Sequence, residues 1–177
     1  MAAISGPRLK SYIQQGKDSQ TAPDRGRALE DMICYVFGKV PGISITHRDE
    51  LNVFHSEEID VACWNERHPK GLPSLPDIIL IECKNVSRAV GSIDVSWFDT
   101  KLENRGLSFG ILVSPYGVTG SSTDGMSAYH VLANSQRDGR RIIVITLDEL
   151  LALTSSEDLV LLVKKKLCLL AVRGTAG

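Results

Sequence analysis

The chain has 177 residues, enough for one domain with a substantial core and too few for us to expect two. Hydrophobic residues make up 43% and charged residues 23% of it, as is usual for a globular protein. The formal net charge of -1 excludes a global positive field, so nucleic-acid binding would need a local basic patch.

The first 22 residues are expected to form a polar, loosely attached extension with one short helix near residues 9–15. A second helix is predicted from Pro23 to Phe37, because proline suits a first helical turn and Gly38 ends the element. Between these ends, apolar residues recur at helical spacing, at Leu29, Met32, Ile33, Val36 and Phe37.

From residue 43 the hydrophobic period changes to two, which is typical of strands. Residues 43–54 and 57–65 are predicted to be antiparallel strands joined near His55, and residues 77–85 form a third strand after a proline-containing loop. The elements expected next are a helix over 93–105 with Ile93, Trp97 and Leu102 near one face, a strand over 107–114, a helix over 126–137 capped by Asp138-Gly139, a strand over 140–146, and helical segments over 147–153 and 159–172.

This order predicts an α/β fold, with a mixed five-stranded sheet flanked by helices on both faces. The expected organisation is an N-terminal extension (1–22), one domain (23–154) and a C-terminal helix packed on that domain (155–177). Lys164, Lys165 and Lys166 are expected to keep the apolar C-terminal helix soluble.

The four cysteines show no CxxC pair and no histidines at zinc spacing, so we expect buried free thiols in a reducing cytoplasm. They are Cys34, Cys63, Cys83 and Cys168. The opening MAAISGPRLK lacks a signal peptide's apolar stretch, and residues 159–172 are too short and too charged to span a bilayer. A cytoplasmic protein without a membrane partner is expected.

Acidic residues interrupt two apolar strands. Leu80, Glu82 and Lys84 share one face of the third strand, and Asp60 interrupts the strand before it. If these strands are neighbours, one register places Asp60 beside Glu82, with Cβ atoms about 4.5–5.5 Å apart. Two carboxylates so close repel each other unless a cation intervenes, and Mg²⁺ commonly uses one or two carboxylates. For Glu82 and Lys84 taken alone, a surface ion pair is the alternative interpretation.

Asp60, followed after a hairpin by Glu82-Cys83-Lys84, resembles the D…(D/E)-x-K signature of the PD-(D/E)XK nucleases. The element order is similar to that family's αβββαβ core, over residues 26–150. The segment from SFGILVS to ITLDEL is similar to the end of Mrr-like restriction endonuclease domains. The resemblance implies a Mg²⁺-dependent DNA endonuclease, with Mn²⁺ expected to substitute, that leaves 5′-phosphate and 3′-hydroxyl ends.

The resemblance also implies individual roles. Asp60 and Glu82 would hold the metal, with the backbone carbonyl of Cys83 or Ile81 as a further ligand, and Lys84 would orient the attacking water. This sequence departs from the family's pattern at one point, because no proline precedes Asp60. The literal Pro76-Asp77 is a weaker match, since Asp77 lies an odd number of residues before Glu82 and so faces the other side of the strand.

Relatives often carry an acid on the first core helix, and Glu30 is the candidate; a solvated glutamate is the alternative. Arg88 is our preferred phosphate contact. Asn85 is a second candidate for substrate binding, with a turn-forming role as the alternative. The other clustered basic residues are expected to be solvated: Arg25, Arg27, Lys101, Arg105, Arg137, Arg140 and Arg141.

No phosphate-binding loop or dinucleotide fingerprint occurs, so no nucleotide cofactor is expected. A homodimer is expected, because cutting both strands of a duplex needs two sites related by a two-fold axis. Two alternatives stay open. One is a Holliday-junction resolvase, against which the near-zero net charge argues, and the other is a non-catalytic nucleic-acid-binding or assembly protein.

Overall fold

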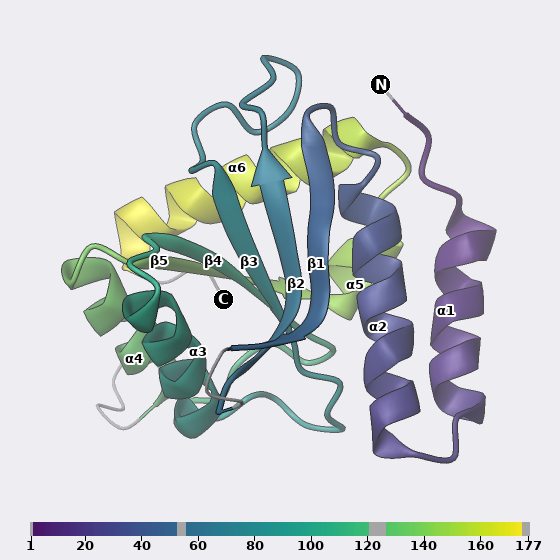
Figure 1. Ribbon diagram of the computed structural model, residues 1–177, viewed down its shortest axis with the longest axis horizontal. Helices are drawn as coiled ribbons and strands as arrows, with labels where there is room; N and C mark the ends of the chain where they lie inside the picture. The colour runs from purple at the N-terminus through teal and green to yellow at the C-terminus, as the bar shows by residue number, and fades with distance from the viewer. Residues whose placement is uncertain (1, 53–55, 121–126, 175–177) are drawn as a thin grey trace.

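The chain adopts an α/β fold, as predicted, with a five-stranded mixed sheet flanked by helices (Figure 1). The computed structural model describes residues 2–52, 56–120 and 127–174. The strands are β1 (Ile43–Leu51), β2 (Glu58–Asn65), β3 (Ile78–Cys83), β4 (Phe109–Ser114) and β5 (Arg141–Thr146). The helices are α1 (Gly6–Asp18), α2 (Ala22–Phe37), α3 (Ser92–Asn104), α4 (Ala128–Arg137), α5 (Leu147–Leu151) and α6 (Ser156–Arg173). The predicted connection at His55 and the predicted helix start at residue 126 lie outside the described residues.

The strands lie in the order in which they occur along the chain. β1, β2 and β3 pair antiparallel, whereas β3, β4 and β5 pair parallel. The pairing in the sheet therefore changes from antiparallel to parallel at β3, the strand that carries Glu82 and leads directly into Lys84.

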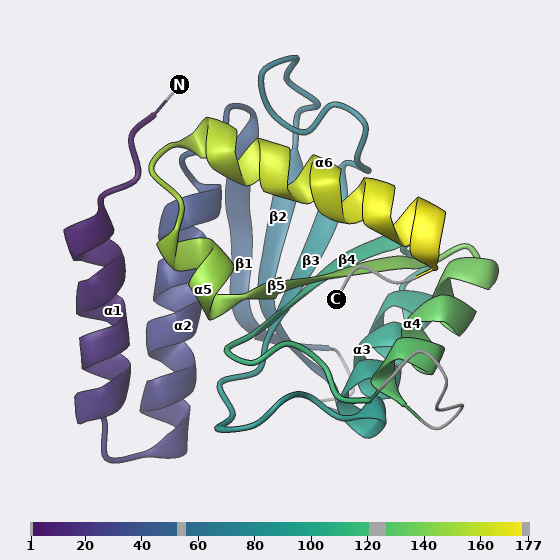
Figure 2. The same cartoon turned by 180° about the vertical axis from the view of Figure 1, so that it is seen from behind.

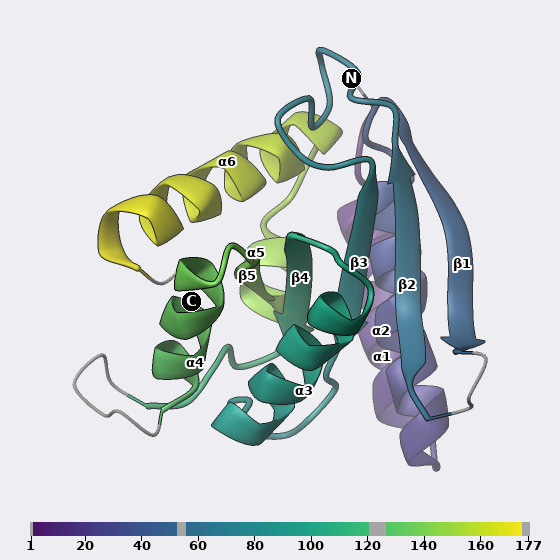
Figure 3. The ribbon, with the colours of Figure 1, turned by 60° about the vertical axis from the view of Figure 1, so that its left-hand side comes forward.

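Helices cover both faces of the sheet. α2, α5 and α6 pack on one face, with α1 outside α2, and α3 and α4 pack on the other (Figures 1 and 2). Figure 3 shows α2 and α3 on opposite sides of β3. Alternation along β3 builds both cores, because Ile79 and Ile81 pack with Ile33 and Phe37 while Leu80 joins the cluster under α3.

The expectation that the N-terminal segment is loosely attached is wrong. Leu9 of α1 is fully buried in the main core, and Tyr12 and Ile13 pack against it. The backbone N–H of Ile4 donates to the carbonyl of Thr154 at 2.9 Å. The spacing of these apolar residues gives α1 a continuous face, which lies along α2.

The face predicted for α3 is also corrected. Val95, Phe98 and Leu102 are its buried residues, at a spacing that lines one side of a helix. Ile93 and Trp97 are 74% and 59% exposed, so they lie away from the core.

The C-terminal helix differs from expectation at two positions. Lys166 is buried and its Nζ lies 2.8 Å from Oε1 of Glu149, so this lysine anchors α6 rather than solubilising it. Cys168 is exposed, whereas Cys63 is buried as expected. None of the helices in the described part of the chain combines the length and hydrophobicity that a bilayer crossing requires.

Candidate active site

Asp60 and Glu82 lie on neighbouring strands in the register that brings their carboxylates together. Val61 pairs with Ile81, so the next position along this antiparallel ladder places Asp60 opposite Glu82. Oδ2 of Asp60 accepts a hydrogen bond of 2.6 Å from the backbone N–H of Cys83. This bond holds the Asp60 carboxylate against the end of β3.

Glu82 is only 3% exposed and is held by two ammonium groups. Nζ of Lys84 lies 3.0 Å from its Oε1, and Nζ of Lys101 lies 2.7 Å from its Oε2. A buried charge is tolerated when it is paired in this way. Both oxygens of Glu82 therefore already have a cationic partner.

Lys101 is a site residue that the sequence prediction missed, because it was expected to be solvated. It comes from α3, three positions after Phe98 and one before Leu102, both of which are buried. This spacing places Lys101 at the border of the buried face, where its aliphatic stem packs and its amine reaches the sheet. The spacing was the only signal in the sequence.

The carboxyl of Asp60 is unusually hard to ionise. Burial and then repulsion from Glu82 raise the pKa of Asp60 to about 6, against the opposing effects of the Cys83 N–H, Lys101 and Lys84. For Lys84, burial alone would lower the pKa of the amine, but the carboxylates of Glu82 and Asp60 raise it above its usual value. Lys84 is accordingly an ammonium ion at neutral pH.

Glu30 of α2 approaches the same strands from the opposite layer. Burial, a hydrogen bond shared with Asp49 and repulsion from Asp49 and Asp60 raise the pKa of Glu30 to about 7. Arg48 opposes this shift, with Nη2 3.4 Å from Oε2 of Glu30. The helix acid is therefore buried and electrostatically coupled to Asp60, unlike the solvated glutamate of the alternative interpretation.

Asp49 is a second residue that sequence reasoning missed. Arg48 pairs with Val61 and Glu50 with Ile59, so Asp49 falls opposite Asp60 in the β1–β2 ladder. Its backbone has a φ of 51°, in the left-handed region that aspartate tolerates better than most residues. Strand alternation cannot anticipate such a conformation, and no motif marks it.

Three other candidates lie apart from this carboxylate group. Asn85 donates its Nδ2 to the carbonyl of Arg25 at 2.6 Å, and so turns toward α2. Arg88 is exposed between β3 and α3 and forms no ion pair with the described residues. Asp77 precedes β3 and lies 2.6 Å from Nε of Arg67, at the strand's other end.

The oxygen donors present suit Mg²⁺, although the ammonium groups of Lys84 and Lys101 lie beside them and oppose a further cation. Among the described residues, no group of three or more His, Cys, Asp or Glu side chains is arranged to hold a metal ion. Asp60 and Glu82 nevertheless supply hard oxygen donors, and the raised pKa of Asp60 reflects crowding that a divalent ion would relieve. Each oxygen of Glu82 has one ammonium partner, so binding through Glu82 would place the ion close to the charges of Lys84 and Lys101, which repel it.

The sequence matches no protein-family model and no curated protein. Function is therefore inferred from the residues themselves.

Proposed function

We propose that the protein is a Mg²⁺-dependent endonuclease that hydrolyses phosphodiester bonds in DNA, with the PD-(D/E)XK arrangement and a restriction or defence role. The observation that carries the proposal is the placement of Asp60 opposite Glu82, with Lys84 3.0 Å from Glu82. Perturbed carboxyl pKa values around such a group are typical of functional sites.

The metal would be held by Asp60 and Glu82, and when bound it supplies the positive charge that stabilises a phosphoryl transition state. Lys84 is an ammonium ion, so it can donate hydrogen bonds to a water or a phosphate oxygen but cannot act as a base. Glu30, with a pKa of about 7, can exchange a proton at neutral pH. Mn²⁺ is expected to replace Mg²⁺.

A homodimer and a cytoplasmic location belong to the same proposal. Two related sites would cut both strands of a duplex, and a two-fold axis is the simplest way to present them. The four cysteines are all unpaired, which suits a reducing compartment.

One observation favours a different role. Both oxygens of Glu82 are held by ammonium groups, so its charge is compensated without any metal. A nuclease-like fold that binds or assembles without turnover would have the same ion pairs. Metal binding separates these two possibilities.

The test uses the purified chain with plasmid, linear duplex, four-way junction and single-stranded DNA, each with Mg²⁺, with Mn²⁺ or with a chelator. We expect metal-dependent cleavage that Asp60→Asn and Lys84→Ala reduce by about 100-fold or more. Asp77→Asn is the matched control, because this half-exposed acid pairs with Arg67 away from the site. Preference for the four-way junction would identify a resolvase. Undiminished cutting by both site variants would refute the assignment, and absence of both cleavage and Mn²⁺ binding by calorimetry would favour the assembly role.

A further inference from the structure

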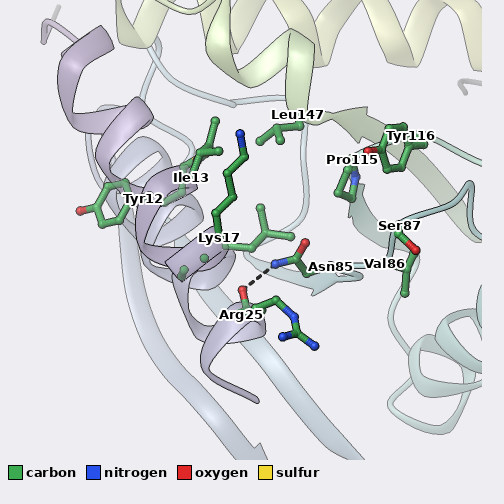
Figure 4. A pocket seen from close by; sticks show the side chains of 14 residues that line it. Tyr12, Ile13, Lys17, Arg25, Asn85, Val86, Ser87, Pro115, Tyr116 and Leu147 are labelled. Atoms are coloured by element: carbon green, nitrogen blue, oxygen red, sulfur yellow. Dashed lines mark hydrogen bonds between the residues drawn. The ribbon is translucent and has the colours of Figure 1, made fainter. Parts of the chain in front are cut away.

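A separate cavity of about 290 Å³ lies between α1, α2 and the ends of three strands (Figure 4). Residues 85–87 follow β3, Pro115 and Tyr116 follow β4, and Leu147 follows β5, and all of them line it. These three strands are parallel, so the cavity lies at their common carboxyl edge. This edge is where open α/β sheets bind ligands.

The floor of the cavity is apolar and already formed. Ala28, Leu29 and Met32 of α2 are buried there, and Ile13 of α1 lies beside them. Gly16 of α1 faces Ala28 of α2, since a Cβ added at Gly16 would stand 3.5 Å from Cβ of Ala28, an ordinary van der Waals contact. A ligand seated on this floor would bury an apolar body.

The rim of the cavity is cationic. Lys17 and Arg25 line it from the side of α1 and α2, with their charged ends pointing in different directions in Figure 4. Neither forms an ion pair with a carboxylate of the described residues. Among the described residues, the side chain of Arg25 makes one long hydrogen bond, from Nη1 to the carbonyl of Ser19 at 3.4 Å. None of the described residues that line the cavity is acidic, although the whole chain has a net charge of -1. Such a rim attracts an anion.

Asn85 fixes one wall and adds a polar contact. Its Nδ2 donates to the carbonyl of Arg25 at 2.6 Å, which ties the segment after β3 to the start of α2. Its Oδ1 accepts no hydrogen bond from the described residues, and the hydroxyl of Ser87 is exposed on the same wall. Both groups can meet polar atoms of a ligand.

We infer that this cavity binds a small organic anion, with a compact apolar body on the floor and a carboxylate or phosphate head at the Lys17 and Arg25 rim. Its volume is at the lower end of the range for ligand pockets, which fits a body of roughly one ring. The lining includes none of Asp60, Glu82, Lys84 or Glu30, so the site is distinct from the proposed nuclease centre.

Methionine methyl NMR can test the inference on the full chain. The protein has three methionines, and Met32 lines the cavity. We would titrate phenylacetate and phenyl phosphate, with inorganic phosphate as the head alone and benzyl alcohol as the body alone. Either organic anion is expected to shift the methyl signal of Met32. The double variant Lys17→Ala/Arg25→Ala is expected to bind these anions at least about tenfold more weakly.

The matched control is Lys10→Ala/Arg27→Ala, which removes one exposed cation from each of the same helices outside the cavity. It is expected to bind like the wild type. Stronger binding of phenylacetate would identify a carboxylic acid ligand, and stronger binding of phenyl phosphate a phosphate ester.

The inference is overturned if neither anion shifts the Met32 signal at about 10 mM, or if the rim variant Lys17→Ala/Arg25→Ala binds as well as the wild type. It is also overturned if the head alone or the body alone binds as tightly as the organic anions. Asp60 does not line the cavity, so Asp60→Asn is expected to bind the organic anions as the wild type does. Binding by this variant therefore tests the cavity independently of the nuclease assay.

Discussion

Lys101 on α3 and Glu82 on β3 form a buried ion pair, with Nζ of Lys101 2.7 Å from Oε2 of Glu82. The two side chains are 12% and 4% exposed. The pair fastens the helix layer to the strand that carries the candidate site, and with Lys84 it balances a carboxylate that water scarcely reaches.

Replacing Lys101 with methionine should destabilise the fold, because it removes one counterion from a buried carboxylate while keeping the aliphatic stem. We expect the free energy of unfolding to fall by about 3 kcal/mol, measured by urea denaturation at pH 7. Glu82→Gln combined with Lys101→Met should recover part of this loss, since the buried side chain at position 82 then carries no charge that needs Lys101. A double variant whose loss equals the sum of the two single losses would show that the pair is not coupled.

Glu30 should make stability depend on pH. A carboxyl whose pKa is raised in the folded protein, here from 4.5 to about 7, stabilises the fold fully at pH below its unfolded pKa. That contribution is lost as the pH rises through 7. Glu30→Gln never ionises, so the free energy of unfolding of the wild type should fall relative to this variant by about 3 kcal/mol between pH 4 and 8.

The measurement is chemical denaturation at several pH values, and Glu58→Gln is the control. Glu58 is an exposed acid of β2, so this variant should follow the wild type throughout. A constant difference between the wild type and Glu30→Gln across this range would contradict the raised pKa.

Metal binding should also depend on pH, through Asp60. Because burial and Glu82 raise the pKa of Asp60 to about 6, a proton competes with the metal below that pH. We expect the affinity for Mn²⁺, measured by calorimetry, to rise up to about tenfold per pH unit below pH 6 and to level off above pH 7. Asp60→Asn should bind Mn²⁺ weakly at every pH; if it retains wild-type affinity, the ion binds elsewhere.

The contact between α3 and β4 has no room for another methyl group. A Cβ at Gly110 would come within 2.6 Å of Cζ of Phe98 and 2.9 Å of Cδ1 of Leu102. Gly110→Ala should therefore cost about 1–3 kcal/mol in the free energy of unfolding. Gly91→Ala, just before α3, is the control because nothing lies within 4 Å of its added Cβ. Equal thermal stabilities of the two variants would contradict this packing.

The sequence was sufficient to predict the sheet and the pair of acids, but not the full surroundings of the site. The two-residue period identified the strands, and Asp60 and Glu82 interrupt apolar runs, so their meeting required only one register. The partner Lys101 depends on how α3 crosses the sheet, which local spacing does not specify. Asp49 depends on a backbone conformation that strand alternation excludes. The position of α1 depends on its packing against α2, a contact between segments that periodicity alone does not pair.

β3 links the antiparallel and the parallel halves of the sheet, since within the sheet β1 and β2 are joined to the parallel strands through the hydrogen bonds between β2 and β3. A slip of the hairpin by two residues along β3 would move Asp60 about 6.6 Å away from Glu82 without altering either side chain. Main-chain bonding, rather than the acids themselves, thus sets the separation on which any shared ion would depend. A force or a ligand that shifts β2 along β3 would therefore change the distance between Asp60 and Glu82.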